Sequence, residues 1–338
     1  RLRRARCLMS GEELIPVFAP NLADVLASRE REKGDALTEG EIEQIRDAAV
    51  CIMLAVDDAR EMERARGYVD VDPDDCWADW HRLRPQLMGR YLPKIVLCTA
   101  GDARFAERAE AFLAKQSVRH EVRGREPRLE EAFTYSQCRR VPSFDDADWD
   151  AIRAHSHVVF AVSQSVKPDS ALAIARRLLQ IGARLLDSCG GVAMKCESSG
   201  IAHGRERWLE LATSASAERP AVSSAALVES FVQFPIGEED EYWTCGMHLL
   251  GWPDLILAPR ILGSDRPDVA GADFFDTLAH YLVVECARGV GGRRFRSGNC
   301  FRTTPDGVLL RGKWEPCQGY EEDSFFHNPF GRLRFSLP

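Results

Sequence analysis

Apolar residues recur at helical spacing near the start of the chain. Between residues 38 and 53 they stand three or four positions apart, at Ile42, Ile45, Ala49 and Ile52. This spacing places their side chains on one face of an α-helix. Thr38 and Glu41 occupy the two positions of a capping box, in which each side chain accepts a hydrogen bond from the other residue's main-chain N–H. The helix is therefore expected to begin at Glu39.

Two more helices are expected on either side of this one. Asn21 is typical of an N-cap residue and Gly34 of a helix stop, which predicts a helix between them. Asp72 followed by Pro73 predicts the start of another helix, because proline is favoured at the first helical position. We therefore expect residues 1–90 to form a mainly helical N-terminal module.

Strand and helix patterns alternate after residue 90. Strands are predicted where apolar residues run together or alternate with polar ones, and helices where the pattern is amphipathic. The predicted order is strand 94–99, helix 102–115, strand 118–123, helix 145–155, strand 157–163, helix 165–182 and strand 183–187. A polar, charged stretch begins at residue 124, which makes residues 124–156 the candidate position of an internal boundary.

The pattern changes again near residue 226 and becomes hairpin-like. Strands are predicted at 226–234, 242–250 and 254–258, then a helix at 273–288 ending on Gly289, and a last hairpin within 295–314. Strands joined by short turns are typical of antiparallel pairing, so a purely parallel sheet is not expected. The predicted fold class is α+β, with a helical N-terminal module followed by a larger mixed-sheet region over residues 91–338.

Composition and charge narrow the class of protein. The chain of 338 residues is 45% hydrophobic and carries a formal net charge of −8, without the basic excess that nucleic-acid binding usually requires. Its 11 cysteines include no CxxC pair and are predicted to be reduced thiols, which favours the cytoplasm. No apolar run reaches the roughly 18 residues of a membrane span. Neither a nucleic acid nor a membrane is therefore expected as a partner.

Potential catalytic groups gather in the segment Leu185–Trp208, which reads LLDSCGGVAMKCESSGIAHGRERW. Ser188 or Cys189 is the candidate nucleophile, with His203 as the base and Asp187 as the carboxylate that orients it. A helix is expected after His203, and the free N–H groups at its start would favour an anion. The candidate ligand-binding residues are Lys195, Ser198, Ser199 and Arg205.

A structural interpretation of the same segment stands beside the catalytic one. Gly190 and Gly191 would form a tight turn, the cysteines would pack as buried thiols, and His203 or a nearby serine would cap a helix. The chain has no nucleophile elbow, phosphate-binding loop or zinc signature, and we predict no cofactor. His155 and His157 could point the same way from a strand, but they lack further ligands and predict no metal site.

Two parts of the chain resemble bacterial protein families. LTEGEIEQIRDAAVCIM (Leu37–Met53), continued by RGYVDVDPDDCWADW (Arg66–Trp80), resembles an N-terminal module of bacterial proteins. The region His157–Trp208 resembles a bacterial domain of unknown function. The resemblance implies no activity and no catalytic residue, so no functional residue is carried over from it.

Two functions follow from these patterns. The first is a cytoplasmic binding or regulatory module that recognises a protein or a small ligand, in line with the mixed charge and the reduced cysteines. The alternative is a hydrolase or transferase that uses a cysteine or serine nucleophile within residues 187–205. The catalytic alternative requires a thiolate or hydroxyl within hydrogen-bond reach of His203. Oligomeric state is left open by the sequence.

Overall fold

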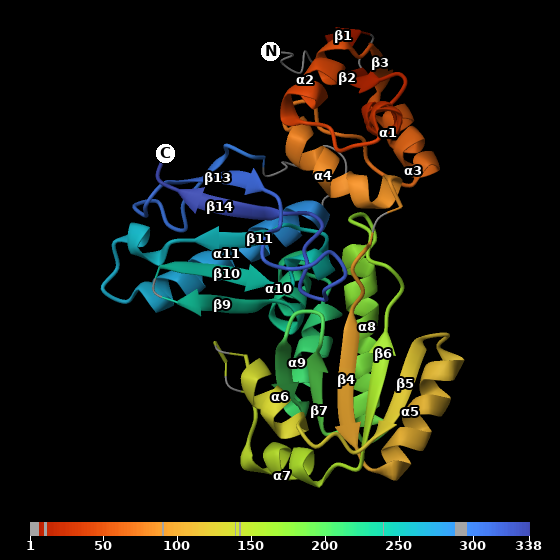
Figure 1. Cartoon of the computed structure of the whole chain (residues 1–338), viewed down its shortest axis with the longest axis vertical. Coiled ribbons are helices and arrows are strands. Elements are labelled where there is room, and N and C mark those ends of the chain that lie inside the picture. Colours follow the sequence, from red (N-terminus) through yellow and green to blue (C-terminus); the bar gives the residue numbers. More distant parts are fainter. Residues whose placement is uncertain are drawn as a thin grey trace. The chain divides into compact units, whose positions relative to one another are not determined.

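The computed structural model describes residues 7–9, 12–89, 91–138, 140–141, 143–238, 240–287 and 296–338. The chain divides into two compact units, whose elements are labelled in Figure 1. The N-terminal unit contains Arg1–Arg90 with Gly289–Gly292, and the C-terminal unit contains Tyr91–Arg288 with Arg293–Pro338.

The N-terminal unit combines helices with a small antiparallel sheet. Its elements are β1 (Cys7–Met9), β2 (Glu12–Phe18), α1 (Leu22–Lys33), α2 (Glu39–Ala48), β3 (Cys51–Ala55), α3 (Val56–Arg66) and α4 (Cys76–Leu87). The strands lie in the order β1-β2-β3, and both pairings are antiparallel. α1, α2 and α4 supply most of the core, with Leu22, Leu26, Ile42, Trp80 and Leu83 completely buried.

The capping box predicted for the second helix is confirmed. The Thr38 side chain accepts a hydrogen bond from the Glu41 N–H at 3.4 Å, and the Glu41 carboxylate accepts one from the Thr38 N–H at 2.7 Å. The expectation that Ile52 belongs to this helix is wrong. α2 ends at Ala48, and Ile52 lies in β3, because the run from Val50 onward is apolar and suits a strand.

The helix expected directly after Asp72 begins three residues later than predicted. Its first residue is Cys76, and Asp75 stands at the N-cap position. The Asp72 carboxylate accepts a hydrogen bond from the Asp74 N–H at 3.1 Å, which holds the preceding residues in a turn. Such local side-chain hydrogen bonds compete with helical ones, so α4 starts only after the turn closes.

The first part of the C-terminal unit forms a five-stranded antiparallel sheet in the order β5-β6-β4-β7-β8. Its strands are β4 (Val96–Gly101), β5 (Arg119–Gly124), β6 (His157–Val162), β7 (Ala193–Cys196) and β8 (Ile201–Gly204). The helices between and after them are α5 (Ala103–Lys115), α6 (Leu129–Ser136), α7 (Asp146–Ala154), α8 (Ala171–Asp187) and α9 (Arg205–Ala215).

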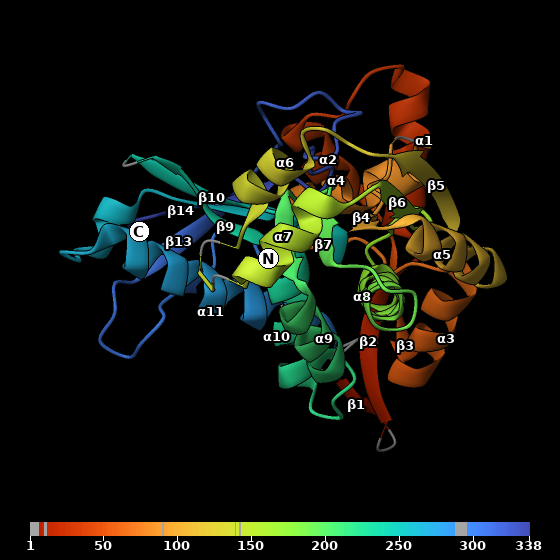
Figure 2. The same cartoon turned by 90° about the horizontal axis from the view of Figure 1, so that it is seen from below.

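Different helices cover the two faces of this sheet, as Figure 2 shows from below. α6 and α7 cover the face of Cys98 and Ala100, where Phe133 and Ile152 are completely buried. Neighbouring residues of a strand point to opposite faces, so Thr99 lies on the other face. α5, α8 and α9 pack on that face, which is the one that carries His203.

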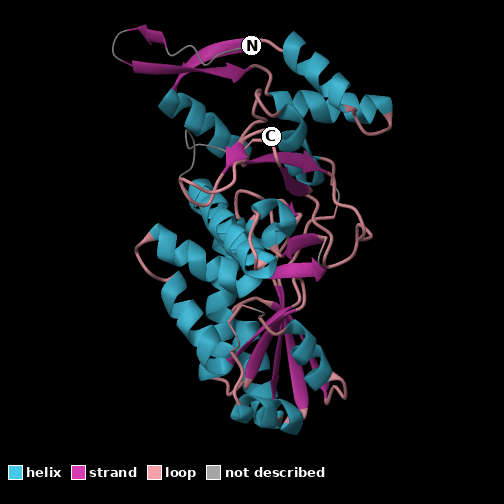
Figure 3. Ribbon diagram, turned by 90° about the vertical axis from the view of Figure 1, so that its left-hand side faces the viewer, coloured by secondary structure: helices cyan, strands magenta, loops and turns pink. Residues whose placement is uncertain are grey.

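The second part of the C-terminal unit forms a six-stranded sheet in the order β12-β13-β14-β11-β10-β9. It contains β9 (Gln233–Glu238), β10 (Glu241–Cys245), β11 (Asp254–Leu257), β12 (Cys300–Phe301), β13 (Leu310–Glu315) and β14 (Arg332–Ser336), with helices α10 (Pro220–Phe231) and α11 (Pro267–Ala287) and short 3-10 helices at Met247–Leu250 and Pro259–Leu262. β11 and β14 pair in parallel, so this sheet is mixed. Figure 3 shows helices and strands side by side in this unit, and the predicted α+β class is confirmed.

Three predicted strands of the C-terminal unit are wrong in whole or in part. Of the predicted strand 242–250, the part after Cys245 is wrong, because Met247–Leu250 forms a 3-10 helix. Residues 183–187 form the end of α8, because Leu185 and Leu186 continue the buried face of that helix. Gly182 does not end the helix; it lies directly against Trp208. Residues 226–231 belong to α10, and β9 begins only at Gln233. The predicted helix end at Gly289 lies outside the described residues.

Candidate functional site

The segment Leu185–Trp208 forms the end of α8, the hairpin of β7 and β8, and the start of α9. In the hairpin, Met194 pairs with His203 and Lys195 pairs with Ala202. Residues paired across two antiparallel strands share a face, and successive residues of one strand alternate. His203 and Lys195 therefore point to opposite faces of the sheet, and these two predicted site residues do not converge.

Among the described residues, neither of the predicted nucleophiles, Ser188 and Cys189, forms a hydrogen bond with His203. Ser188 is exposed and ends α8, while Cys189 is buried. Burial raises the pKa of the Cys189 thiol, and it raises the pKa of the completely buried Cys196 to about 11. Thiols with raised pKa values are mostly protonated near neutral pH and are poor nucleophiles.

The other predicted site residues are engaged within the chain itself. Asp187 and Arg205 form an ion pair with each other at 3.4 Å. Lys195 donates to the Glu197 carboxylate at 2.5 Å. Each of the two cations, Lys195 and Arg205, is therefore already paired with a carboxylate of the chain.

Ser198 and Ser199 are buried in the turn between β7 and β8. The Ser198 hydroxyl donates to the main-chain oxygen of Lys94 at 2.6 Å and accepts from the Val96 N–H at 3.0 Å. The hydroxyl therefore attaches the turn to the start of β4. This contact makes Ser198 a structural residue.

Among the predicted catalytic residues, His203 lines a pocket formed by described residues. Its side chain is 1% exposed, and Nε2 lies 3.0 Å from the main-chain oxygen of Glu229. A carbonyl oxygen only accepts, so Nε2 carries the hydrogen and Nδ1 of the neutral ring is an acceptor. Burial lowers the pKa of His203 to about 4, which keeps the ring neutral near pH 7. Nδ1 is buried and has no hydrogen-bond partner among the residues that the structure describes.

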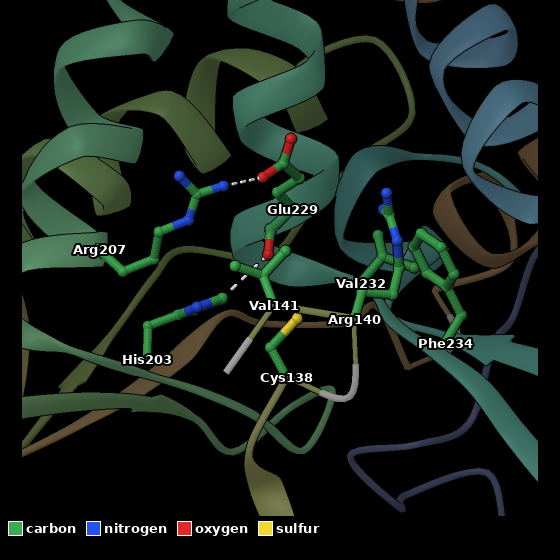
Figure 4. A pocket seen from close by; sticks show the side chains of 8 residues that line it. All are labelled: Cys138, Arg140, Val141, His203, Arg207, Glu229, Val232 and Phe234. Carbon is green, nitrogen blue, oxygen red and sulfur yellow. Dashed lines mark hydrogen bonds and ion pairs between the residues drawn. The ribbon is translucent and has the colours of Figure 1, made fainter. Parts of the chain in front are cut away.

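Figure 4 shows the pocket into which the His203 ring points. The thiol of Cys138 extends into the same space, and Arg207 forms an ion pair with Glu229 at its edge. Arg140 lies over the Phe234 ring at 5.0 Å and donates to Asp276 at 2.5 Å. The remaining residues that line the pocket are Val141 and Val232.

The enclosed volume of this pocket is about 10 Å³. That is close to the space that one water molecule requires, and far below the several hundred Å³ of a typical small-molecule site. A substrate does not fit here in this conformation. What the arrangement offers is a single unsatisfied acceptor, His203 Nδ1, beside one thiol.

Cys138 was not a predicted site residue. It lies in the polar stretch between α6 and α7, and it follows Gln137, which forms an isolated bridge with Ala202 of β8. This bridge places the thiol beside a histidine 65 positions away in the sequence. No motif or periodicity accompanies Cys138, so the sequence carries no signal for the pairing.

A second candidate site is the sheet of the N-terminal unit. Five residues of β2, Leu14–Phe18, pair with five residues of β3, Cys51–Ala55, and all ten are apolar. Only Phe18 is buried; Ile52 and Met53, which point to opposite faces, are 40% and 43% exposed. We call these ten residues the apolar ladder. Apolar strands exposed on both faces are unusual on a protein surface unless another molecule covers them.

Within the described ranges, His, Cys, Asp and Glu side chains form no group of three that could hold a metal ion. No described helix is both long enough and apolar enough to span a membrane.

The chain has no match among known proteins in any of three comparisons: no family model, no curated protein and no solved structure matches it. The resemblance of Leu37–Trp80 and His157–Trp208 to bacterial families therefore stays a prediction.

Proposed function

We propose that this chain is a protein-binding module that takes an extended segment of a partner protein on the apolar ladder. The observation that carries the proposal is the exposure of β3, whose residues are all apolar and none of them buried. β3 is also an edge strand: among the described strands only β2 pairs with it. An edge strand offers free main-chain N–H and C=O groups to a further strand.

The chemistry of the ladder defines the partner segment. β3 carries no charged residue, so a matching strand is apolar over about five residues. Ile52 and Met53 would each contact one face of the added strand, since successive side chains alternate. Main-chain hydrogen bonds supply affinity in this mode of recognition, and the alternating side chains supply specificity.

The catalytic alternative has less support. It requires a nucleophile from residues 187–205 beside His203, whereas the pKa values of the Cys189 and Cys196 thiols are raised by burial. A small-ligand site beside the predicted site residue His203 is also less favoured, because the pocket there encloses only about 10 Å³. We further propose that the module acts in the cytoplasm, where the nine cysteines described as free would stay reduced.

Site-specific photo-crosslinking tests this function. A photoreactive phenylalanine analogue replaces Ile52 in the full chain, which is then irradiated in cells of the source organism. Val222 on α10 is the matched control, since it is apolar and 40% exposed like Ile52. We expect one adduct of defined mass from position 52, containing a second protein cross-linked to this chain, and none from position 222.

Two variants test whether the adduct at position 52 depends on the edge strand β3. Met53→Lys adds a charge to the same edge, so it should remove the adduct formed at position 52. Val222→Lys should leave that adduct unchanged. An adduct that contains only two copies of this 37.9 kDa chain would identify the ladder as a homodimer interface and overturn the proposal. Equal labelling at positions 52 and 222 would overturn it as well.

A further inference from the structure

The pocket of Figure 4 brings together a reactive group and an unsatisfied one. Cys138 is partly exposed as a residue, and its thiol is free. His203 is 1% exposed and points into the same pocket. Neither residue takes part in the apolar ladder, so this site is independent of the proposed binding function.

His203 Nδ1 needs a hydrogen-bond donor. Its other nitrogen, Nε2, donates to the Glu229 main-chain oxygen at 3.0 Å, which assigns the lone pair to Nδ1. Nδ1 is buried, and none of the described residues is its hydrogen-bond partner. A buried acceptor without a donor destabilises the folded state, so a group that donates to it here would be stabilised.

The size of the pocket limits what that donor can be. About 10 Å³ accommodates a single oxygen atom with its hydrogen. An O–H group attached to the Cys138 sulfur has this size and begins at the right place. Val141 and Val232 add apolar side chains to the lining, and the Glu229 carboxylate in the same lining already accepts from Arg207.

We propose that Cys138 is a site of reversible oxidation by hydrogen peroxide, and that His203 retains the product as a sulfenic acid by accepting a hydrogen bond from its O–H. The site would make the chain responsive to peroxide. The ligand class is a small peroxide, and no metal or cofactor is needed.

The chemical step is balanced by peroxide itself. The Cys138 thiol loses its proton to solvent, and the sulfur attacks one oxygen of hydrogen peroxide. An S–O bond forms and the O–O bond breaks, so the sulfur loses two electrons and peroxide oxygen gains them. The second oxygen leaves as hydroxide and takes up a proton to become water. The new S–O–H hydrogen then points at His203 Nδ1.

Other cysteines of the same chain serve as internal controls for Cys138. Cys51 and Cys300 are exposed, so peroxide reaches them, but no histidine shares a described pocket with either. Cys98, Cys196 and Cys245 are buried, and burial raises the pKa of each thiol. Selective persistence of the sulfenic acid at Cys138 would therefore reflect its pocket and not exposure alone.

Trapping with dimedone tests the proposal in the whole chain of residues 1–338. The protein is treated briefly with one equivalent of hydrogen peroxide, the peroxide is removed, and dimedone is added after a delay. Trypsin then places Cys138, Cys51 and Cys300 in separate peptides, residues 129–139, 47–60 and 297–302. We expect the dimedone label at Cys138 to exceed that at either exposed cysteine about fivefold, the factor that one hydrogen bond supplies.

Two substitutions distinguish the effect of losing His203 from a general effect of replacing a histidine by phenylalanine. His203→Phe fills the same volume without an acceptor and should reduce the Cys138 label to the level of Cys51. His157→Phe, at a partly exposed histidine of β6, is the matched control and should leave it unchanged. Equal labelling of Cys138, Cys51 and Cys300, or full labelling of Cys138 in folded His203→Phe, would overturn the proposal.

A measurement on the unaltered chain decides the case even where His203→Phe does not fold. Histidine enriched in ¹⁵N allows the Nδ1 resonance of His203 to be followed by NMR before and after peroxide. Acceptance of a hydrogen bond should move this resonance to lower frequency, and a thiol reductant should restore it. An Nδ1 resonance that stays in place while Cys138 is oxidised would exclude the His203 contact.

Discussion

His203 and Lys195 belong to one hairpin, yet their side chains lie on opposite faces of the five-stranded sheet. Met194 shares the face of His203, and the Thr99 hydroxyl donates to its sulfur at 3.2 Å. Lys195 lies on the other face, paired across the sheet with Cys98. The histidine therefore belongs to the pocket formed with α10, while the lysine pairs with Glu197 elsewhere.

Protonation of His203 should destabilise the folded protein at acid pH. Its pKa is about 4 when folded and about 6.5 when unfolded, so between these values the unfolded state binds more protons. The free energy of unfolding should be fully retained above about pH 6.5 and should fall towards pH 4, by roughly 3 kcal/mol.

Urea unfolding at several pH values measures this effect, and His203→Gln isolates it from the titration of carboxylates. The glutamine keeps an N–H donor for the Glu229 oxygen but does not titrate. The difference in unfolding free energy between the two proteins should change with pH in the same interval. An NMR titration midpoint for His203 near 6.5 would contradict the prediction.

Ser198 and Ser188 should respond differently to alanine substitution. Ser198→Ala removes both hydrogen bonds that attach the β7–β8 turn to Lys94 and Val96, and leaves buried main-chain groups without partners. We expect a loss of about 2 kcal/mol in the free energy of unfolding. Ser188→Ala, at an exposed helix end, should change it by less than about 0.5 kcal/mol. Equal losses in thermal or urea unfolding would refute this assignment.

The sequence predicted elements whose signals are local. Thr38 and Glu41 define the start of α2 because the two groups of a capping box are three residues apart and interact directly. The run 157–163 predicted a buried strand and corresponds to β6. Such features depend on the chain's immediate chemistry, so they can be inferred without knowledge of the fold.

Features that depend on distant contacts could not be inferred. Gly182 suggested a helix end, but it permits the close approach of Trp208, 26 positions later. The expected site residues lie close together in the sequence. Strand register nevertheless separates His203 from Lys195, and the bridge of Gln137 to Ala202 brings Cys138 to the pocket of His203. The side-chain face of a short strand and the partner of a loop residue are set by tertiary packing.

Alkylation rates should separate the cysteines by environment. Cys300 is exposed and should react readily with iodoacetamide in the native protein, whereas Cys51 is exposed but partial burial raises its thiol pKa, so it should react more slowly than Cys300. Cys189 and Cys196 should react slowly at pH 7, because burial both shields the thiols and raises their pKa values. Peptide-resolved mass spectrometry follows each site. Fast alkylation of Cys189 below about pH 7 would instead support the catalytic alternative.

Alanine at Gly182 should destabilise the C-terminal unit. A Cβ atom there would lie 2.6 Å from Nε1 of Trp208, whose indole is completely buried and donates to the Leu179 oxygen at 3.1 Å. The ring has little room to move, so we expect Gly182→Ala to cost about 1–3 kcal/mol.

Gly40→Ala is the matched helical control, because nothing lies within 4 Å of a Cβ built at Gly40. There alanine should stabilise α2 by about 0.5 kcal/mol through its higher helix propensity. The two variants thus have effects of opposite sign on the free energy of urea unfolding, although the chemical change is the same. A stabilising effect of Gly182→Ala would mean that α8 and α9 can separate without cost, against the close packing of Gly182 on Trp208.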